Sequence, residues 1–395
     1  MTKNMNSQNN TEKVLSVRGL KVYFPVKKGI FKKTVGHVKA VDGVSFDIYR
    51  GKTLGLVGES GCGKTTVAKA IVKLVHAHEG EVICKGTDLL TAKPSKLREL
   101  RKHIQMIFQD PFSSLDPKMT VGNIIGEAVK FHRPDEDTEK LVLNYMEITG
   151  LRGEYYKRYP HEFSGGQRQR IGIARALATE PSIVVADEPV YALDVSVQAK
   201  ALNLMKNLQQ RLDLSYLFIT HDLSVVKHIS HQIAVMYLGS IVEIFNSKDL
   251  KNKTVHPYTR ALISSIPSST PGQKREEIIL QGEIPSPMNA PPGCKFQTRC
   301  QYKTSICEKV KPELEPINSS SISSAQKSPL GASNLPPVQS HNSVSTMPNR
   351  NKHLQGNIPA SELTHLVACH NWRSLPFNID NLHFNIDKKA GNIAP

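Results

Sequence analysis

No run of 18 apolar residues occurs in this 395-residue chain, so the sequence predicts no membrane-spanning helix. The first 13 residues, MTKNMNSQNNTEK, are polar and lack the apolar core of a secretory signal peptide. We therefore expect the chain to stay in the cytosol. Hydrophobic residues make up only 39% of it, which suggests that part of the sequence does not pack into a core.

Cysteine is also scarce, with six in the chain. Structural disulfides are rare in the cytosol, so clustered cysteines point to metal or redox chemistry.

Acidic residues are fewer than basic ones, 35 against 51, which gives a net charge of +16. Nucleic acid, an anionic membrane surface and polyphosphate ligands each suit a basic protein, and charge alone does not choose among them.

A phosphate-binding loop organises the chain. It fits G-x-x-x-x-G-K-[ST] within nine consecutive residues: Gly58, Glu59, Ser60, Gly61, Cys62, Gly63, Lys64, Thr65 and Thr66. A buried strand is expected at 53–57 and a helix at 67–74, which is the context that this motif needs. The glycines let backbone N–H groups converge on one phosphate chain, and the helix start adds its positive dipole end. Lys64 should reach the β- and γ-phosphates of a nucleotide, and the Thr65 hydroxyl should bind Mg²⁺.

Other polar residues stand at the ends of predicted buried strands: Gln109 after 104–108, Asp187 and Glu188 after 182–186, and His221 after 217–220. Ligands of α/β sheets bind at such ends. Asp187 suits a Mg²⁺ site, and Glu188 suits a general base or an orienting group for attacking water. Taken alone, Gln109 and His221 fit ordinary structural positions better.

A second anion site is expected at 164–167, where Ser164, Gly165, Gly166 and Gln167 precede a helix at 171–179.

Two positions have open roles. Phe24, or less readily Tyr23, could stack on a nucleotide base or be an ordinary core aromatic. Cys62 lies beside N–H donors and Lys64, which favours a reactive thiolate, although a small filler residue fits equally well.

Strands alternate with helices through residue 245, which predicts an α/β domain around a mostly parallel sheet. Residues 120–160 interrupt this alternation and read as a small helical insertion. Residues 316–360 are rich in Ser, Asn, Pro and Gln and are predicted to be disordered.

The order and rough spacing of these motifs resemble the ATP-binding subunits of ABC transporters. A Ser-Gly-Gly-Gln signature between a P-loop and a Walker B strand is highly specific. Residues 37–44, 256–259 and 282–287 further resemble the oligopeptide/dipeptide importer branch. The resemblance implies a P-loop ABC ATPase domain at 13–255, with a helical subdomain at about 112–165. A cysteine-containing C-terminal region would comprise 256–315 and 361–370, followed by a tail at 371–395.

The resemblance also implies a mechanism. Two such subunits, identical or different, would face each other head to tail, with ATP between the P-loop of one and residues 164–167 of the other. Glu188 would polarise water, His221 would position the γ-phosphate, and Gln109 would sense the Mg²⁺ held by Thr65 and Asp187. Asp194 would lie at the dimer seam.

The same resemblance implies the partners. Two membrane permease subunits would hold the peptide path and contact the 109–116 loop and the helical insertion. An extracytoplasmic peptide-binding protein would deliver the peptide. The subunit would work at the cytoplasmic face of the bacterial inner membrane, with no nucleic-acid partner.

Two alternatives stay open. The same machinery could carry nickel or another small solute, because substrate choice lies in other subunits. A soluble ABC ATPase acting on nucleic acid or ribosomes is compatible with the charge, but such proteins normally carry two cassettes in one chain.

The chain departs from the family pattern at Tyr191, where Ser is usual, and at Gln301, where Pro is usual. A bulky ring at the seam predicts unequal composite sites.

Four cysteines are expected to lie together: Cys294, Cys300, Cys307 and Cys369. Their C-x₅-C-x₆-C spacing lacks the C-x₂-C pairs of zinc ribbons, which favours iron–sulfur over zinc, with free thiols as the third option. Similar segments of the peptide-importer branch are associated with a [4Fe–4S] cluster. A metal bound by all four cysteines would hold residues 361–370 against residues 294–307.

Overall fold

The computed structural model describes residues 12–110, 112–250, 252–266, 277–317, 365–373 and 375. Nearly all of the predicted disordered insertion, 316–360, lies outside these residues, as does most of the tail 371–395.

The main sheet has eight strands in the order β11-β12-β10-β9-β3-β8-β7-β6. The first four along the chain are β3 (Thr53–Val57), β6 (Ile104–Ile107), β7 (Ile183–Asp187) and β8 (Ser215–Ile219); they are followed by β9 (Gln232–Tyr237), β10 (Ser240–Asn246), β11 (Glu315–Pro316) and β12 (Leu366–Val367). From β9 to β6 all neighbours are parallel, whereas β10, β11 and β12 pair antiparallel. The predicted mostly parallel sheet is therefore present. The central strands β3, β7 and β8 are buried at every position, because other elements cover both faces.

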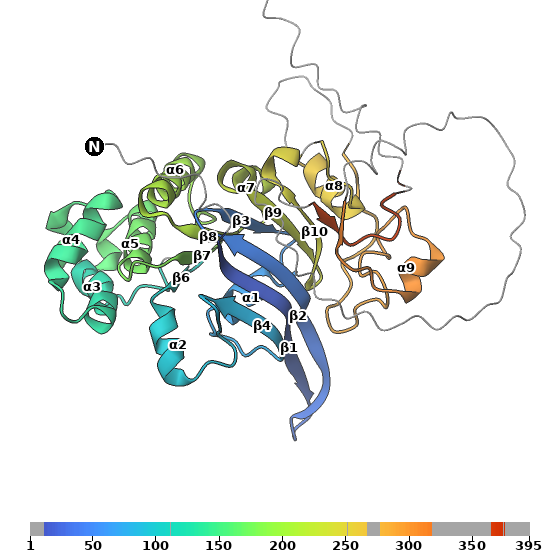
Figure 1. Cartoon of the computed structure of the whole chain (residues 1–395), viewed down its shortest axis with the longest axis horizontal. Helices are drawn as coiled ribbons and strands as arrows, with labels where there is room; N and C mark the ends of the chain where they lie inside the picture. The colour runs from blue at the N-terminus through green and yellow to red at the C-terminus, as the bar shows by residue number, and fades with distance from the viewer. Residues whose placement is uncertain are drawn as a thin grey trace, which may run out of the picture.

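A smaller antiparallel sheet has the order β2-β1-β4-β5, with β1 (Lys13–Lys28), β2 (Lys33–Tyr49), β4 (Glu79–Cys84) and β5 (Thr87–Asp88). The first two strands form a long hairpin that projects from the molecule in Figure 1. Pairing between them continues to Lys28 and Lys33, so these basic residues belong to the paired strands of the hairpin.

The helices are α1 (Lys64–Ile71), α2 (Pro94–Arg101), α3 (Val121–His132), α4 (Thr138–Ile148), α5 (Gly165–Leu177), α6 (Val195–Leu212), α7 (Leu223–Ile229), α8 (Pro257–Ser264) and α9 (Ser305–Lys309). Successive residues of β7 enter different cores. Ile183 and Val185 pack with the small sheet and α1, whereas Val184 and Ala186 pack with residues of α3 to α7. This alternation follows from the pleat of the strand and places α1 between the two sheets.

The helical insertion and the C-terminal segment lie at opposite ends of the long axis in Figure 1. The insertion comprises α3, α4 and short 3₁₀ turns. The C-terminal segment is mostly irregular and is joined to the main sheet through β12, which pairs with both β10 and β11. The Asn371 amide donates to the Tyr302 carbonyl at 2.7 Å, so the returning chain lies beside the cysteine-bearing residues.

Candidate ATP-binding site

A cavity of about 560 Å³ opens over the loop between β3 and α1. All nine predicted phosphate-loop residues, 58–66, line it. Gln109, Glu188 and His221 reach it from the ends of strands in the main sheet. The opposite wall comes from Lys39 and Ala40 of β2, with Gly239 from the turn between β9 and β10. No feature of the sequence predicted this wall, because it depends on how the two sheets pack.

The loop wraps closely around the start of α1. Gly63 has φ +107°, and a Cβ there would lie 2.1 Å from the Ala40 carbonyl oxygen. Only glycine fits this combination of backbone angle and space. The Lys64 ammonium is folded onto the loop and donates to the carbonyls of Gly58 at 2.8 Å and Glu59 at 3.0 Å. A phosphate group in the cavity would offer this ammonium a stronger, charged acceptor.

Thr65 and Asp187 are brought together as the sequence predicted. The Thr65 hydroxyl donates to Asp187 Oδ1 at 3.1 Å. Burial raises the pKa of Asp187, and the Thr65 hydrogen bond opposes this rise. A buried carboxylate beside a hydroxyl oxygen is a donor set that suits Mg²⁺, whose charge would stabilise the ionised form.

Glu188 is held from two sides. The Gln109 amide donates to its Oε2 at 2.9 Å, and His221 Nδ1 lies 3.1 Å from its Oε1. The backbone of Glu188 has φ +46°, an uncommon conformation for a residue with a side chain. Its N–H donates to the Ile219 carbonyl at 2.9 Å. The carboxylate is therefore fixed in the lining of the cavity, where it can orient a water molecule.

Comparisons with known proteins agree with this geometry. Residues 41–191 match the ABC transporter family, and residues 242–307 match the oligopeptide/dipeptide transporter, C-terminal region, family. The chain is 50% identical over 312 residues to the oligopeptide transport ATP-binding protein AppF of Bacillus subtilis, covering 78% of this chain and 94% of that protein. The chain belongs to the ABC transporter family of ATP-binding subunits.

Other similar proteins are also ATP-binding subunits for the transport of oligopeptides or dipeptides. The chain is 48% identical to the oligopeptide transport ATP-binding protein OppF of Escherichia coli, over 82% of this chain and 100% of that protein. The dipeptide transport ATP-binding protein DppF of Haemophilus influenzae is 49% identical, over 76% of this chain and 93% of its own length. Among solved structures, a dimer of the ATP-binding cassette MJ0796 bound to ADP and Pi has a TM-score of 0.52 at 26% identity. That match covers 59% of this chain and 98% of the cassette.

The signature residues of this ABC ATPase lie outside the cavity. Ser164 caps α5, since its hydroxyl accepts from the Gln167 N–H at 3.4 Å while the Gln167 side chain accepts from the Ser164 N–H at 3.0 Å. Ser164 and Gly165 are exposed, and none of residues 164–167 lines the cavity. Asp194 caps α6 through the Val197 N–H at 3.3 Å. The chain therefore presents a second helix start suited to anions, separate from its own phosphate loop.

Cys62, Phe24 and Tyr23 are the single residues for which the sequence left the role open. Cys62 is only 6% exposed, and burial raises its pKa although Lys64 acts in the opposite direction, which favours the small filler residue over the reactive thiolate. Phe24 is 41% exposed and Tyr23 donates to Asp42 at 2.8 Å. Neither ring is among the described residues that line the cavity, so stacking on a base stays an untested prediction.

The four cysteines lie in one region, but their side chains are not gathered as metal ligands among the described residues. The Cys294 N–H donates to the Cys307 carbonyl at 2.8 Å, and the Asn371 amide lies 3.8 Å from Cys307 Sγ. Among the described residues, which include all four cysteines, no three His, Cys, Asp or Glu side chains are placed to hold a metal ion. Burial raises the pKa of Cys294 to about 11 and that of Cys369 to about 12. The predicted [4Fe–4S] site therefore has no support from the positions of these thiols.

Tyr191 is 62% exposed, and its ring meets the ring of His221 edge to face with centroids 5.0 Å apart. We predict that Tyr191→Ser raises ATP hydrolysis of the assembled transporter by at least about twofold, because the change frees both the histidine and the surface on which the resemblance places a second subunit. Tyr191→Phe keeps the ring and should match the wild type. Steady-state phosphate release measures both, and unchanged or slower hydrolysis by the serine variant would count against the prediction.

Proposed function

We propose that this chain is the ATP-binding and hydrolysing subunit that powers import of oligopeptides or dipeptides through a membrane ABC transporter. The observation that carries the proposal is the placement of Glu188, between Gln109 and His221, in the lining of the same cavity that the whole phosphate loop lines. The match of residues 242–307 to the oligopeptide/dipeptide transporter region supports the peptide class of cargo.

In the proposed reaction, the phosphate loop receives the phosphates of ATP, and Lys64 turns from its own backbone carbonyls to the β- and γ-phosphates. Mg²⁺ held by Thr65 and Asp187 would neutralise charge that develops on the phosphates. Glu188 accepts a hydrogen bond from the attacking water and orients it toward the γ-phosphorus. Gln109 and His221 fix the orientation of the Glu188 carboxylate, and His221 also faces the space for the γ-phosphate.

The exposed helix start at Ser164 completes the site of a second subunit in this proposal. Two copies of the chain, or this chain and a related ATPase, would bury ATP between the phosphate loop of one and residues 164–167 of the other. Closure on ATP and reopening after hydrolysis would drive two membrane permease subunits, to which an extracytoplasmic binding protein delivers peptide. No helix in the described part of the chain has the length and apolar character needed to cross a bilayer. A peripheral position at the cytoplasmic face of the bacterial inner membrane suits such a subunit.

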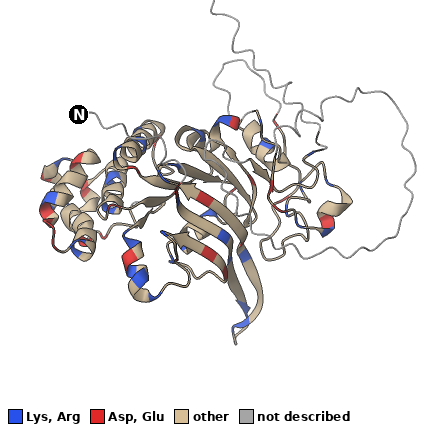
Figure 2. Ribbon diagram, in the orientation of Figure 1, with Lys and Arg blue, Asp and Glu red and all other residues tan. Residues whose placement is uncertain are grey.

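Capture of partners tests this assignment. The tagged full-length chain, purified from detergent-solubilised membranes, should bring down two permeases and an ATPase, and ribonuclease treatment should not change the set. Recovery of RNA or ribosomal proteins without permeases would favour the nucleic-acid alternative. Figure 2 shows acidic residues interspersed with basic ones over most elements in view, whereas the projecting end of the β1–β2 hairpin carries basic residues alone. Stimulation by nickel but not by peptides would favour the small-solute alternative.

We also propose that Cys294, Cys300, Cys307 and Cys369 hold an iron–sulfur cluster, on the basis of their spacing and the family resemblance. The thiols would have to close on one another to do so. Anaerobically purified protein should then be brown and contain about four iron and four sulfide per chain, and Cys300→Ser should lose the iron. Cys84→Ser, a change of a buried cysteine in β4, is the matched control and should keep it. Colourless protein with one zinc, or unchanged iron in the Cys300 variant, would contradict the cluster.

A further inference from the structure

Residues 294–300 of the C-terminal segment contact two walls of the nucleotide cavity. This segment contains three residues, Lys295, Phe296 and Arg299, that reach back into the ATPase domain. None of the three was predicted to act in the site. Because the contacts are buried or half-buried and partly ionic, they can set the shape of the cavity.

Arg299 binds the phosphate loop through Glu59. Its two terminal nitrogens lie 3.0 to 3.3 Å from the Glu59 carboxylate oxygens. The side chains of Arg299 and Glu59 are only 9% and 24% exposed, so water screens the pair weakly. The Glu59 N–H also donates to the Tyr258 hydroxyl at 3.0 Å. The second residue of the phosphate loop is thus held both by its backbone and by its carboxylate.

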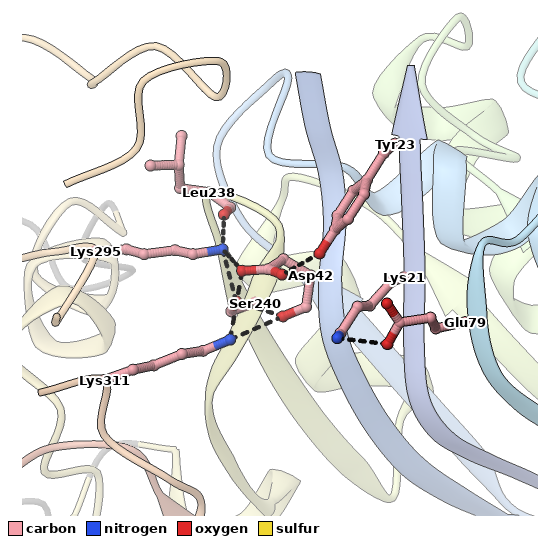
Figure 3. A network of polar contacts seen from close by, with 8 residues as sticks. All are labelled: Lys21, Tyr23, Asp42, Glu79, Leu238, Ser240, Lys295 and Lys311. Carbon is pink, nitrogen blue, oxygen red and sulfur yellow. Dashed lines mark hydrogen bonds and ion pairs between the residues drawn. The ribbon is translucent and has the colours of Figure 1, made fainter. Parts of the chain in front are cut away.

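Lys295 binds the opposite wall through Asp42 (Figure 3). The Lys295 ammonium lies 2.8 Å from the Asp42 carboxylate and donates to the Leu238 carbonyl and the Ser240 hydroxyl, each at 2.9 Å. Burial of Asp42 works to raise its pKa, but Lys295, with help from other neighbours, holds the pKa of this carboxyl well below its usual range.

Asp42 is directly connected to the cavity. It stands two residues after Ala40, which lines the cavity, and its N–H donates to the Gly239 carbonyl at 2.7 Å. Phe296, which follows Lys295 in the sequence, packs its ring on Tyr237 and Tyr258 with centroids 5.2 and 5.4 Å apart. The three contacts therefore join the phosphate loop and the β2 wall into one packed unit.

We propose that Arg299 and Lys295 are positioning residues for the nucleotide, and that residues 294–300 clamp the phosphate loop to the β2 wall. Arg299 fixes the loop through Glu59, and Lys295 fixes the wall through Asp42. Displacement of this segment should lower the affinity for ATP more than it changes the rate at which bound ATP is hydrolysed, because neither Arg299 nor Lys295 touches Glu188. The inference rests on the proposed binding of ATP in this cavity.

The direct test is a titration of the purified full-length chain with a fluorescent ATP analogue and Mg²⁺. Arg299→Gln should weaken binding by about tenfold, the expected loss for a charge-assisted contact of this kind. Arg299→Lys, which keeps the charge but not the two-nitrogen contact, should fall between that variant and the wild type. Lys303→Gln is the matched control. Lys303 lies three residues beyond this segment and pairs with Glu308 at the surface, so its removal should leave binding unchanged.

A double-mutant cycle separates positioning from general stability. If Arg299 acts through Glu59, Arg299→Gln should add less than about twofold in a Glu59→Gln background. Melting temperatures without nucleotide are measured alongside. Lower melting temperatures with wild-type affinity in both Arg299 variants would overturn the proposal, and so would full additivity in the cycle. Failure of the wild-type chain to bind the analogue would instead remove the proposed function.

Discussion

Replacing Glu188 by Gln should reduce ATP turnover by at least about a hundredfold, which is the usual contribution of a positioned general base. The amide keeps the shape of the side chain, but it cannot accept a proton or a strong hydrogen bond from water. Binding should survive, because the phosphate loop, Lys64 and Thr65 are unchanged. We expect the variant to accumulate as a closed, ATP-bound dimer, visible as a nucleotide-dependent shift in size-exclusion chromatography.

The control for this change is Glu81→Gln, which alters an exposed carboxylate on β4 away from the cavity. Its turnover should equal that of the wild type. Phosphate release and nucleotide binding are measured on the same preparations. Turnover of the Glu188 variant within about threefold of the wild type, a barrier change below roughly 0.7 kcal/mol, would sink the assignment.

Replacing Gly63 by Ala should weaken ATP binding by at least about a hundredfold, or roughly 2.7 kcal/mol. An added Cβ would lie 2.1 Å from the Ala40 carbonyl oxygen and 2.9 Å from the Met236 methyl carbon. The first clash is with backbone, so no side-chain rotation relieves it, and the loop must move away from β2. Its N–H groups would then no longer converge on the phosphates.

Gly86→Ala is the matched control for backbone strain. Gly86 has φ +74° in the turn between β4 and β5, but an added Cβ meets no atom within 4 Å. This variant should lose about 1 to 2 kcal/mol of stability and no nucleotide affinity. The two are compared by fluorescent nucleotide titration and thermal unfolding. Equal affinity in the two alanine variants would show that the tight contact at Gly63 does not shape the site.

The chemical groups of the site were predictable because they follow local rules. Gln109, Glu188 and His221 each end a buried strand, and parallel strands bring such ends to one edge of the sheet. The capping role of Ser164 follows from its place before a glycine-initiated helix. The positions of these groups need only the pattern of neighbouring residues. The roles of Gln109 and His221 needed the family resemblance as well, because each side chain taken alone fits an ordinary structural position better.

The surroundings of the site were not predictable, because they depend on contacts between distant segments. Arg299 and Glu59 are 240 positions apart, and no local pattern links them. Lys295 and Asp42 are likewise joined only when the C-terminal segment packs against β2 and the turn before β10. Cys62 shows the same limit: its sequence neighbours favour a thiolate, yet burial by the fold decides its pKa.

The measurement closest to the central claim is peptide uptake by the assembled transporter. The complex captured with the tagged chain is reconstituted into proteoliposomes with ATP on the side of the ATPase, and a labelled peptide with its binding protein is placed on the other side. We predict that peptide accumulates only with ATP and Mg²⁺, and that Glu188→Gln in this chain abolishes accumulation while the complex stays intact. ATP hydrolysis that neither responds to peptide nor drives its accumulation would contradict the claim that this chain powers peptide import.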